Sequence, residues 1–297
     1  MISLTYTLTP LDRATHLRGD EARIKELLTG GAARIVPVWN ERHLVDAAPR
    51  LQVLDYAMAA RFDLSNIVFL GLAGETPWFA LRLPGSETPP ELEIPGTFQV
   101  LNEFVAVLTG DEAAILAYAR AMVLWHRNHL HCGRCGAPTR ATEAGHSSTC
   151  TVCGHRTFPR TDPVVITLIT HKNKCLLGRK AEWPAGMFSC IAGFVEPGET
   201  LESAVRRECA EETGASVDEV RYIASQPWPF PASIMFGFRA RAKSLDLTGR
   251  DDELADVRWF TRDDVRRFGE RSDPGDGFKL PNRYAIARHL IEQWLAE

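Results

Sequence analysis

The stretch "RRECAEETG", residues 206–214, contains three glutamates at helical spacings of three and four. On a helix Glu208, Glu211 and Glu212 are neighbours, and each pair of like charges at such spacings costs about 0.2–0.5 kcal/mol. A cation close to the three carboxylates would remove this repulsion. The stretch therefore predicts a helix over residues 200–213 that ends at Gly214 and whose carboxylates have a positively charged partner.

The face of this helix that carries the glutamates is also its apolar face. At about 100° per residue, Glu211 and Glu212 lie within about 60° of Glu208. The same arc contains the apolar residues Leu201, Ala204 and Val205. Because unpaired carboxylates are costly on a buried face, we expect either a metal ion or salt bridges to arginines. Carboxylate oxygen suits Mg²⁺ or Mn²⁺, and Mg²⁺ keeps bound waters and contacts substrate phosphates.

Length and composition indicate a soluble globular protein of two or three units. The chain has 297 residues, of which 45% are hydrophobic, and single cores rarely grow beyond about 250–300 residues. No apolar run approaches the roughly 18 residues that span a bilayer, so we expect no membrane association. The opening "MISLTYTLTPLDRATHLRGD" lacks a basic leader and an apolar segment, which predicts a cytoplasmic location.

The net charge of −4 gives no general attraction for a nucleic-acid backbone. Any RNA would have to be bound locally, by basic residues such as Arg156 and Arg160. A broad basic surface is therefore not expected.

Two CxxC pairs predict a metal site between residues 128 and 160. The four cysteines, separated by fourteen residues between the pairs, are Cys132, Cys135, Cys150 and Cys153. Four thiolates at this spacing suit one tetrahedral Zn²⁺ per chain in a ribbon, and a site with four protein ligands is structural. A redox pair is the alternative. Nearby histidines at 126, 129, 131 and 146 could compete as ligands, but we interpret them as solvated loop or helix residues.

The chain divides into three predicted domains. Residues 1–127 form an α/β domain with strands at 33–39, 67–72 and 78–83 and a helix at 109–128, where Thr109 and Glu112 form a capping box. Residues 128–160 form the zinc ribbon. Residues 161–297 form an α/β unit with mixed strands.

The last of these domains has a clear series of elements. Extended stretches are expected within 163–180, around a turn at 172–174, and at 186–195, 220–226 and 233–242, with a closing helix at 286–295. A further stretch, "SQPWPFPAS" at 225–233, places three prolines around Trp228 and Phe230. It is expected to be stiff and extended, presenting flat rings on which a base can stack, for about 1–3 kcal/mol. A proline-rich structural loop is the alternative.

The spacing around the glutamates resembles the Nudix box, GX5EX7REUXEEXGU, where U is aliphatic. Gly193, Glu199 and the run Arg207–Ala215 fill every fixed position, with Cys209 and Ala215 smaller than the usual aliphatic residues. The resemblance implies a loop–helix–loop within a Nudix fold, a mixed sheet sandwiched by helices. It also implies hydrolysis of a nucleoside diphosphate linked to another moiety.

The Nudix resemblance also implies roles for individual residues. Glu208, Glu211 and Glu212 would be ligands of the catalytic Mg²⁺ or Mn²⁺, together with the backbone carbonyl of Ala192. Arg207 would hold Glu199 and the loop in place. Glu253 would be a further metal ligand, although a solvated acidic turn is the alternative there. Glu211 and Glu253 are both candidates for the general base.

Four features together resemble the NADH pyrophosphatase branch of this family: the four-cysteine ribbon, "TFPRTDPVVI" at 157–166, the box and the QPWPFP run. The resemblance is strong over 128–297. It implies cleavage of NAD(H) to NMN(H) and AMP, removal of NAD caps from RNA, and a homodimer whose sites draw on both chains. The implied substrate-binding residues are Gln226, Pro227, Trp228, Pro229, Phe230, Pro231, Ala232, Ser233, Phe194, Ala287 and Phe158, the last where Tyr is common.

Two other functions remain open at this point. One is hydrolysis of ADP-ribose or a dinucleoside polyphosphate on the same fold. The other is a nucleic-acid-binding module with a degenerate Nudix domain, which the intact box opposes.

Overall fold

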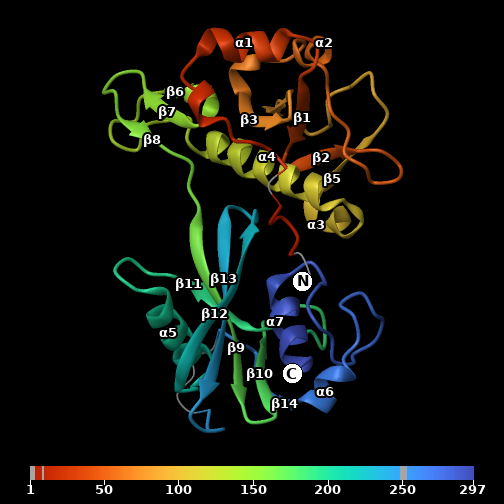
Figure 1. Cartoon of the computed structure of the whole chain (residues 1–297), viewed down its shortest axis with the longest axis vertical. Helices are drawn as coiled ribbons and strands as arrows, with labels where there is room; N and C mark the ends of the chain where they lie inside the picture. The colour runs from red at the N-terminus through yellow and green to blue at the C-terminus, as the bar shows by residue number, and fades with distance from the viewer. Residues whose placement is uncertain (1–3, 9, 248–252) are drawn as a thin grey trace. The chain divides into compact units, whose positions relative to one another are not determined.

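The computed structural model describes residues 4–8, 10–247 and 253–297. Contacts divide the chain into two compact units, each described by itself (Figure 1). The N-terminal unit comprises residues 6–160 and 229–232, and the C-terminal unit comprises 161–228 and 233–297 together with Leu4 and Thr5. The ribbon residues group with the N-terminal unit. The division into three domains stays a prediction.

The N-terminal unit is built on a five-stranded sheet in the order β3-β4-β1-β2-β5. Its strands are β1 Arg34–Trp39, β2 Arg42–Val45, β3 Ile67–Ala73, β4 Thr76–Arg82 and β5 Thr97–Val100. Its helices are η1 Thr15–Leu17, α1 Glu21–Thr29, α2 Tyr56–Ala59, η2 Leu64–Asn66, α3 Leu101–Phe104, η3 Val105–Val107 and α4 Gly110–Asn128. The predicted strands are confirmed as β1, β3 and β4, whereas β2 and β5 were missed.

Helix α4 begins as the sequence predicts. The Thr109 hydroxyl accepts from the Glu112 N–H at 3.2 Å, and the Glu112 carboxylate accepts from the Thr109 N–H at 3.0 Å. Each bond satisfies a donor that the helix start leaves free, which makes the capping box. The helix then buries eleven of its residues, Trp125 among them, so burial as well as the cap stabilises it.

The ribbon is a three-stranded sheet, β6-β7-β8, with strands Thr139–Thr142, Ser147–Cys150 and Arg156–Thr157 and the turn η4 Glu143–Gly145. The prediction that its histidines are solvated is wrong for two of them. His146 is buried and its Nε2 donates to the Phe69 carbonyl, and the half-buried His126 donates to the Gly145 carbonyl, both at 2.7 Å. His146 thus binds a backbone carbonyl of β3, and His126 binds one of the turn η4.

Two buried histidines make the stability of the N-terminal unit depend on pH. Burial lowers the pKa of His43 to about 3 and that of His146 to about 4. Between these values and the unfolded pKa of about 6.5, only the unfolded chain binds the protons. Stability is therefore fully present above pH 6.5 and falls by up to about 1.4 kcal/mol per pH unit and group on acidification. Unfolding midpoints between pH 7.5 and 4.5 check this.

The variant His43→Leu isolates one of these groups, because the ring nitrogens of His43 make no hydrogen bond within the described residues. Its stability should fall less steeply with acid than that of the wild type. His16→Gln, which changes an exposed histidine of the same unit, should leave the slope unchanged. Equal slopes in all three proteins would remove His43 as a cause.

The C-terminal unit is a mixed sheet between helices, as the fold prediction states (Figure 1). The strand order is β12-β13-β9-β10-β14, with β11 beside β9, and β13 runs parallel to β9. The strands are β9 Asp162–His171, β10 Lys174–Arg179, β11 Ile191–Phe194, β12 Val217–Trp228, β13 Ser233–Ala242 and β14 Asp256–Thr261. The helices are α5 Leu201–Thr213, α6 Arg262–Arg266 and α7 Ile286–Leu295.

Alternation along β9 explains the two cores. Val165 and Ile169 pack with the residues of α5, whereas Ile166 and Leu168 pack with α7. Side chains of a strand point alternately to opposite faces, so each helix covers one face of the sheet. No helix in the described part of the chain combines the length and apolar character needed to cross a membrane.

Two predicted extended stretches are shorter in the structure. Of residues 186–195, only Ile191–Phe194 form a strand, and Gly186 has a positive φ of 73°. The stretch 225–233 is not extended throughout. Trp228 pairs with Ser233, and residues 229–232 form the turn between β12 and β13. Proline favours such turns as readily as extended chain, which is why composition alone misplaced this segment.

Candidate active site

Helix α5 carries the three glutamates and has the ends that the sequence predicts. Its N-cap is Thr200, whose hydroxyl accepts from Ser203 N–H, and it ends at Gly214 in the left-handed region, at φ 74°. Glu212 is only 2% exposed, and the side chain of Glu208 is 12% exposed. The side chain of Glu211 is 53% exposed, so the expectation that all three face inward is wrong for Glu211.

The reason lies in where the buried arc is centred. Cys209 and Thr213 are fully buried, and at about 100° per residue they lie about 100° and 140° from Glu208. Glu212, at about 40° from Glu208, is therefore central in the buried face, whereas Glu211, about 60° to the other side, lies outside it. The buried arc of α5 is wider than the positions of Leu201, Ala204 and Val205 indicate, because it also includes Cys209 and Thr213.

The carboxylate of Glu208 occupies space that only a glycine at position 193 leaves open. A Cβ on Gly193 would lie 1.9 Å from Cδ of Glu208 and 2.0 Å from its Oε1. Gly193 belongs to β11, between Ala192 and Phe194, and pairs with Val165 of β9. Strand β11 thus holds the Ala192 carbonyl one residue away from Gly193, where the side chain of Glu208 approaches the backbone.

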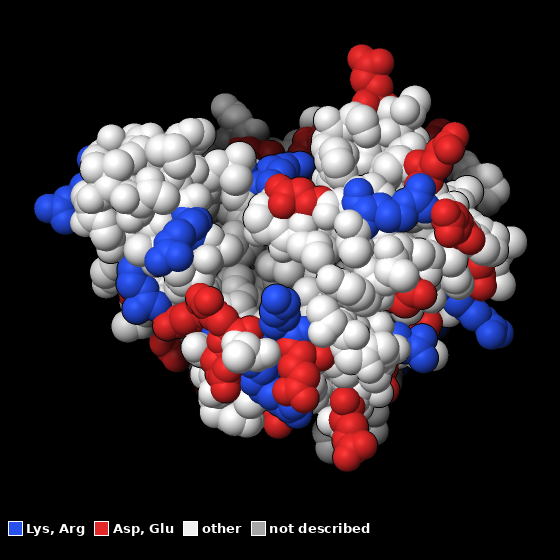
Figure 2. All heavy atoms as spheres, turned by 90° about the horizontal axis from the view of Figure 1, so that it is seen from above, with Lys and Arg blue, Asp and Glu red and all other residues white. Residues whose placement is uncertain are grey.

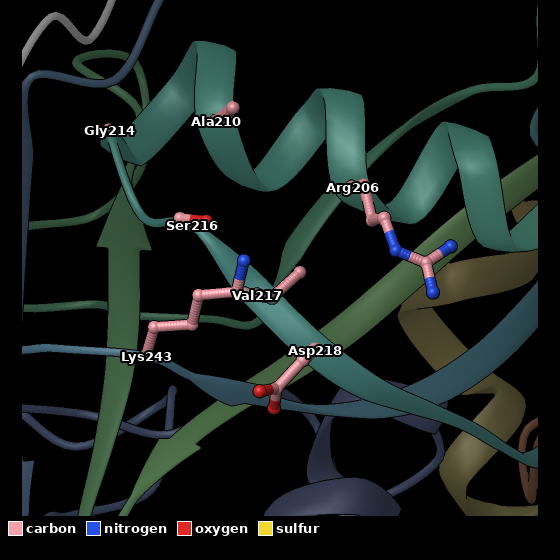
Figure 3. Close-up of a pocket in the computed structure, with 7 residues that line it drawn as sticks. All are labelled: Arg206, Ala210, Gly214, Ser216, Val217, Asp218 and Lys243. Carbon is pink, nitrogen blue, oxygen red and sulfur yellow. The ribbon is translucent and has the colours of Figure 1, made fainter.

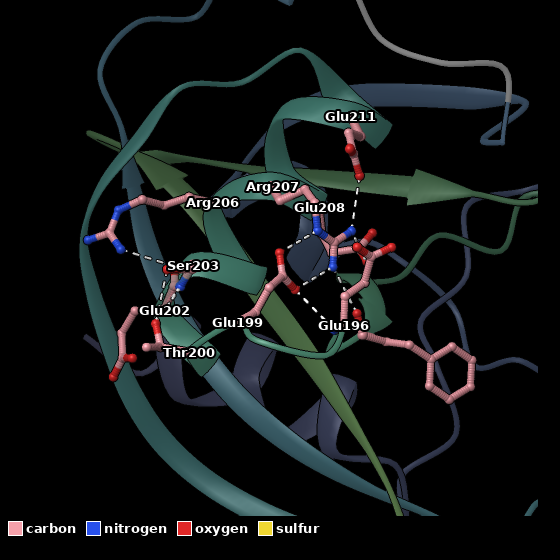
Figure 4. Close-up of polar contacts among 10 residues, drawn as sticks. Glu196, Glu199, Thr200, Glu202, Ser203, Arg206, Arg207, Glu208 and Glu211 are labelled. Carbon is pink, nitrogen blue, oxygen red and sulfur yellow. Dashed lines mark hydrogen bonds and ion pairs between the residues drawn. The ribbon is translucent and has the colours of Figure 1, made fainter.

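Arg207 connects the carboxylates of the loop and the helix (Figure 4). Its Nε and Nη2 donate to the two oxygens of Glu199 at 2.7 and 2.8 Å. Its Nη1 donates to Glu208 at 2.8 Å and to Glu211 at 3.0 Å. Nη2 also donates to the Phe194 carbonyl at 2.9 Å. One guanidinium therefore ties the loop before α5, the end of β11 and two glutamates together.

The charges around Arg207 separate the carboxylates into two kinds. The hydrogen bonds from Arg207 and from the Glu196 N–H lower the pKa of Glu199 to about 2. Burial raises the pKa of Glu208, Arg207 opposes that rise, and the charges of Glu211 and Glu253 add to it. Glu199 is therefore an anion held in place by Arg207. Glu208 is surrounded by further negative charges, and a bound cation would favour its ionised form.

Lys180 is a residue that sequence reasoning missed. It lies at the end of β10, and its Nζ forms an ion pair of 2.6 Å with Glu253. The pKa of Lys180 is raised, first by this hydrogen bond and further by the charges of Glu253 and Glu212. The two partners are 73 positions apart, and no local pattern indicates such a contact.

The carboxylates fit a hydrated divalent ion better than a closed protein cage. Within the described residues, the cysteines form the one group of three or more His, Cys, Asp or Glu whose donor atoms lie within 4.8 Å of one another. The glutamates are therefore spread more widely. Mg²⁺ is usually bound by one or two carboxylates and keeps several waters, which suits carboxylates that do not converge on one point.

The four cysteines fit a tetrahedral ion closely. Sγ of Cys132 lies 3.8 Å from that of Cys153, and Sγ of Cys135 lies 3.4 Å from Cys150 and 3.5 Å from Cys153. Zinc with four sulfurs at about 2.3 Å holds them about 3.8 Å apart. Backbone N–H groups of Cys153 and Val152 donate to the Cys150 sulfur and lower its pKa to about 6, which favours the thiolate that binds metal.

The aromatic candidates differ in exposure. Phe158 and Phe194 are 60% and 59% exposed, which is unusual for such large apolar side chains and suits stacking. The Arg156 guanidinium lies 5.4 Å from the centroid of the Phe158 ring. Trp228 is half-buried and stacks on Tyr284, with centroids 6.1 Å apart and ring planes at 25°.

The other members of the implied substrate-binding run have varied positions. Gln226 is fully buried, and its amide donates to the carbonyls of Tyr284 and Thr5 and accepts from the Ile286 N–H. Ala287 belongs to α7 and lies in the core between that helix and the sheet. The remaining members, at the end of β12, in the following turn and at the start of β13, range from buried to exposed: Pro227, Pro229, Pro231, Ala232 and Ser233.

Arg120 of α4 is a second residue that sequence reasoning missed. It is 4% exposed, its guanidinium lies 5.3 Å from the Phe230 ring centroid, and it forms a 2.6 Å ion pair with Glu41. The turn 229–232 and α4 belong to the same compact unit. Within that unit, Arg120 therefore contacts Phe230 of the implied substrate-binding run.

A cavity of about 550 Å³ beside α5 does not coincide with this site (Figure 3). Its lining residues are Arg206, Ala210, Gly214, Ser216, Val217, Asp218 and Lys243. None of the candidate catalytic carboxylates belongs to this lining. We therefore locate the candidate active site by its chemistry and not by cavity volume.

Comparisons with known proteins agree with this fold. Residues 159–279 match the NUDIX domain family, and residues 32–125 match the NADH pyrophosphatase-like rudimentary NUDIX domain. The chain is 40% identical over 298 residues to the NAD-capped RNA hydrolase NudC of Mycobacterium bovis, covering 96% of this chain and 92% of that protein.

Two further relatives match a part of the chain. The human NAD-capped RNA hydrolase NUDT12 is 44% identical over 198 residues, which is 63% of this chain and 43% of NUDT12. The chain thus spans less than half of that relative's length. A solved Nudix hydrolase from Nitrosomonas europaea is 25% identical, with a TM-score of 0.39 over 52% of this chain and 99% of that chain.

The sheet sandwiched by helices, with the box on α5, defines a Nudix hydrolase. The chain belongs to the NADH pyrophosphatase branch of the Nudix family, on its match to the rudimentary domain and its near full-length likeness to NudC.

Proposed function

We propose that this chain hydrolyses the diphosphate bond of NAD or NADH, giving NMN or NMNH and AMP, and that it also removes NAD caps from RNA 5′ ends. The reaction adds one water across the bridging P–O bond. The observation that carries the proposal is the Glu208 carboxylate, seated against Gly193 and surrounded by Glu211, Glu253 and Arg207. The name of the M. bovis relative supports the substrate.

Different residues of the chain would have different roles in the reaction. Mg²⁺ or Mn²⁺, when bound, supplies charge neutralisation at the diphosphate and a more acidic water. Glu208, Glu211, Glu212, Glu253 and the Ala192 carbonyl are the proposed ligands. Arg207 fixes Glu199 and Glu208 relative to each other. Glu211 or Glu253 would accept the proton of the attacking water.

The proposed substrate contacts come from exposed rings and the β12–β13 turn. Phe158 and Phe194 offer faces for stacking a base or nicotinamide ring. Trp228 stacks on Tyr284, and Phe230 lies beside the Arg120 guanidinium. Because both rings already have fixed neighbours, substrate binding costs them little conformational entropy. Gln226 would act by holding the end of β12 in place, since its amide is occupied by backbone groups.

A product assay tests this function. The purified protein is incubated with NADH, NAD, NAD-capped RNA, ADP-ribose or a dinucleoside polyphosphate at equal concentration, with Mg²⁺ or Mn²⁺ and with chelator. We expect NMN(H) and AMP from the dinucleotides, NMN from the capped RNA, and no product with chelator. A clear preference for ADP-ribose or the dinucleoside polyphosphate would replace this proposal by the alternative on the same fold.

We further propose a cytoplasmic homodimer with one structural Zn²⁺ per chain. The dimer rests on the family resemblance, in which sites draw on both chains, and the zinc on the sulfur geometry. Light scattering gives the mass of the assembly, and metal analysis gives the zinc content per chain.

A further inference from the structure

A second polar cavity lies within the N-terminal unit, away from the carboxylates of α5. It has a volume of about 360 Å³, within the roughly 300–1,000 Å³ of small-ligand sites. The 3₁₀ turn η2, the start of β3, the end of β4, the end of α4 and the ribbon strands β6 and β7 line it. The ribbon and the N-terminal sheet thus form its walls jointly.

The lining of this cavity is cationic. Its charged side chains are those of Arg82 and Arg140, beside the imidazoles of His126 and His129 and the hydroxyls of Ser65 and Ser148, and within the described part of the chain no aspartate or glutamate lines it. Burial lowers the pKa of His126, and the positive charge of Arg82 lowers it further against a backbone hydrogen bond to Gly145. The positive charge of the wall therefore comes from the two arginines, without a balancing carboxylate in the lining.

The two arginines have donors to spare. Arg82 donates through Nη2 to Asn66, and its buried Nε has no hydrogen-bond partner among the described residues. Arg140 is exposed on β6, and neither arginine forms an ion pair within residues 4–8, 10–247 and 253–297. Asp63 interacts with Arg82 electrostatically, but its carboxylate accepts hydrogen bonds from Ser65 and Asn66.

The C-terminal end of α4, which lines the cavity, repels an anion less strongly than a helix end whose carbonyls are all free. His129 Nδ1 donates to the Trp125 carbonyl at 2.7 Å, and His126 donates to the Gly145 carbonyl. The first bond occupies a carbonyl near the end of α4, which would otherwise present partial negative charge, and the second occupies a carbonyl of η4. Leu130, 47% exposed, adds an apolar face to the same wall.

We propose that this cavity binds a phosphate-bearing nucleotide, with Arg82 and Arg140 on the phosphate. A guanidinium presents a planar fork of N–H donors that matches phosphate oxygens, and Leu130 packs against the sugar or base. Arg and Lys are mixed with Asp and Glu over the face seen in Figure 2, and the net charge is −4. Because the protein as a whole does not attract anions, Arg82 and Arg140 are the groups that attract the phosphate. The nucleotide is either free or part of an RNA chain.

Binding of two probes tests the proposal. The probes are AMP, followed by calorimetry, and an uncapped ten-nucleotide RNA, followed by fluorescence anisotropy at low salt. Neither contains the diphosphate bond of the proposed reaction, so the result is independent of hydrolysis. Arg140→Gln and Arg82→Gln should each weaken at least one probe by about tenfold, as expected for a lost charge-assisted hydrogen bond.

Arg50→Gln is the matched control, because Arg50 is exposed in the same unit and does not line the cavity. Weakening of AMP identifies a free nucleotide, and weakening of the RNA alone identifies an RNA chain. If Arg82→Gln does not fold, probe binding by Arg140→Gln, a substitution at an exposed position, still tests the proposal. Unchanged binding of both probes by Arg140→Gln, equal weakening by Arg50→Gln, or no binding of either probe by the wild type would overturn the proposal.

Discussion

Replacing Glu212 by glutamine is expected to lower the turnover of NADH at least about a hundredfold while the variant still binds NADH. Glu212 is 2% exposed on α5, and its negative charge contributes to the raised pKa of Lys180. Glutamine keeps the shape that packs in this position and removes the charge that attracts a divalent ion. Steady-state rates and NADH titration without added metal measure the two effects.

Glu202→Gln is the control for this substitution. It makes the same chemical change on the same helix, but Glu202 is exposed and belongs to the solvent side of α5. Its turnover should equal that of the wild type. If the two variants have similar turnover, the buried glutamate is not a metal ligand, and the alternative of a structural salt-bridge network around Arg207 gains support.

The sequence predicts this helix well because every signal is local. Gly214 marks its C-terminal end, and the box spacing selects Glu208 and Glu212 as candidate ligands before any contact is known. The capping box of α4 and the paired cysteines are equally local. Such features depend on residues a few positions apart, so composition and spacing are enough.

Features that depend on distant contacts were not predictable in this way. The close approach of Gly193 in β11 to Glu208 in α5 depends on how the strand and the helix pack, and Lys180 contacts Glu253 across 73 positions. The exposure of Glu211 depends on where the sheet meets α5. The turn at 229–232 follows from the pairing of Trp228 with Ser233, which proline content does not reveal.

Replacing Cys132 by serine is expected to abolish zinc binding and to lower the melting temperature of the N-terminal unit strongly. Within residues 128–160 the buried hydrophobic residues are Cys132 and Cys150, so the ribbon has no apolar core that could replace the metal. Structural zinc contributes about 10–16 kcal/mol in small peptides, as much as a typical domain's whole stability of about 5–15 kcal/mol. Calorimetry and metal analysis measure the two losses.

Cys175→Ser separates metal loss from the general cost of a buried hydroxyl. Cys175 is fully buried in the C-terminal unit and lies outside the four-cysteine group. This variant should lose stability and keep one zinc per chain, whereas Cys132→Ser should lose both. Because η4 of the ribbon packs against β3, loss of zinc should also loosen that contact and raise amide exchange along β3. An unchanged melting temperature in Cys132→Ser would show that the cysteines do not hold a structural ion.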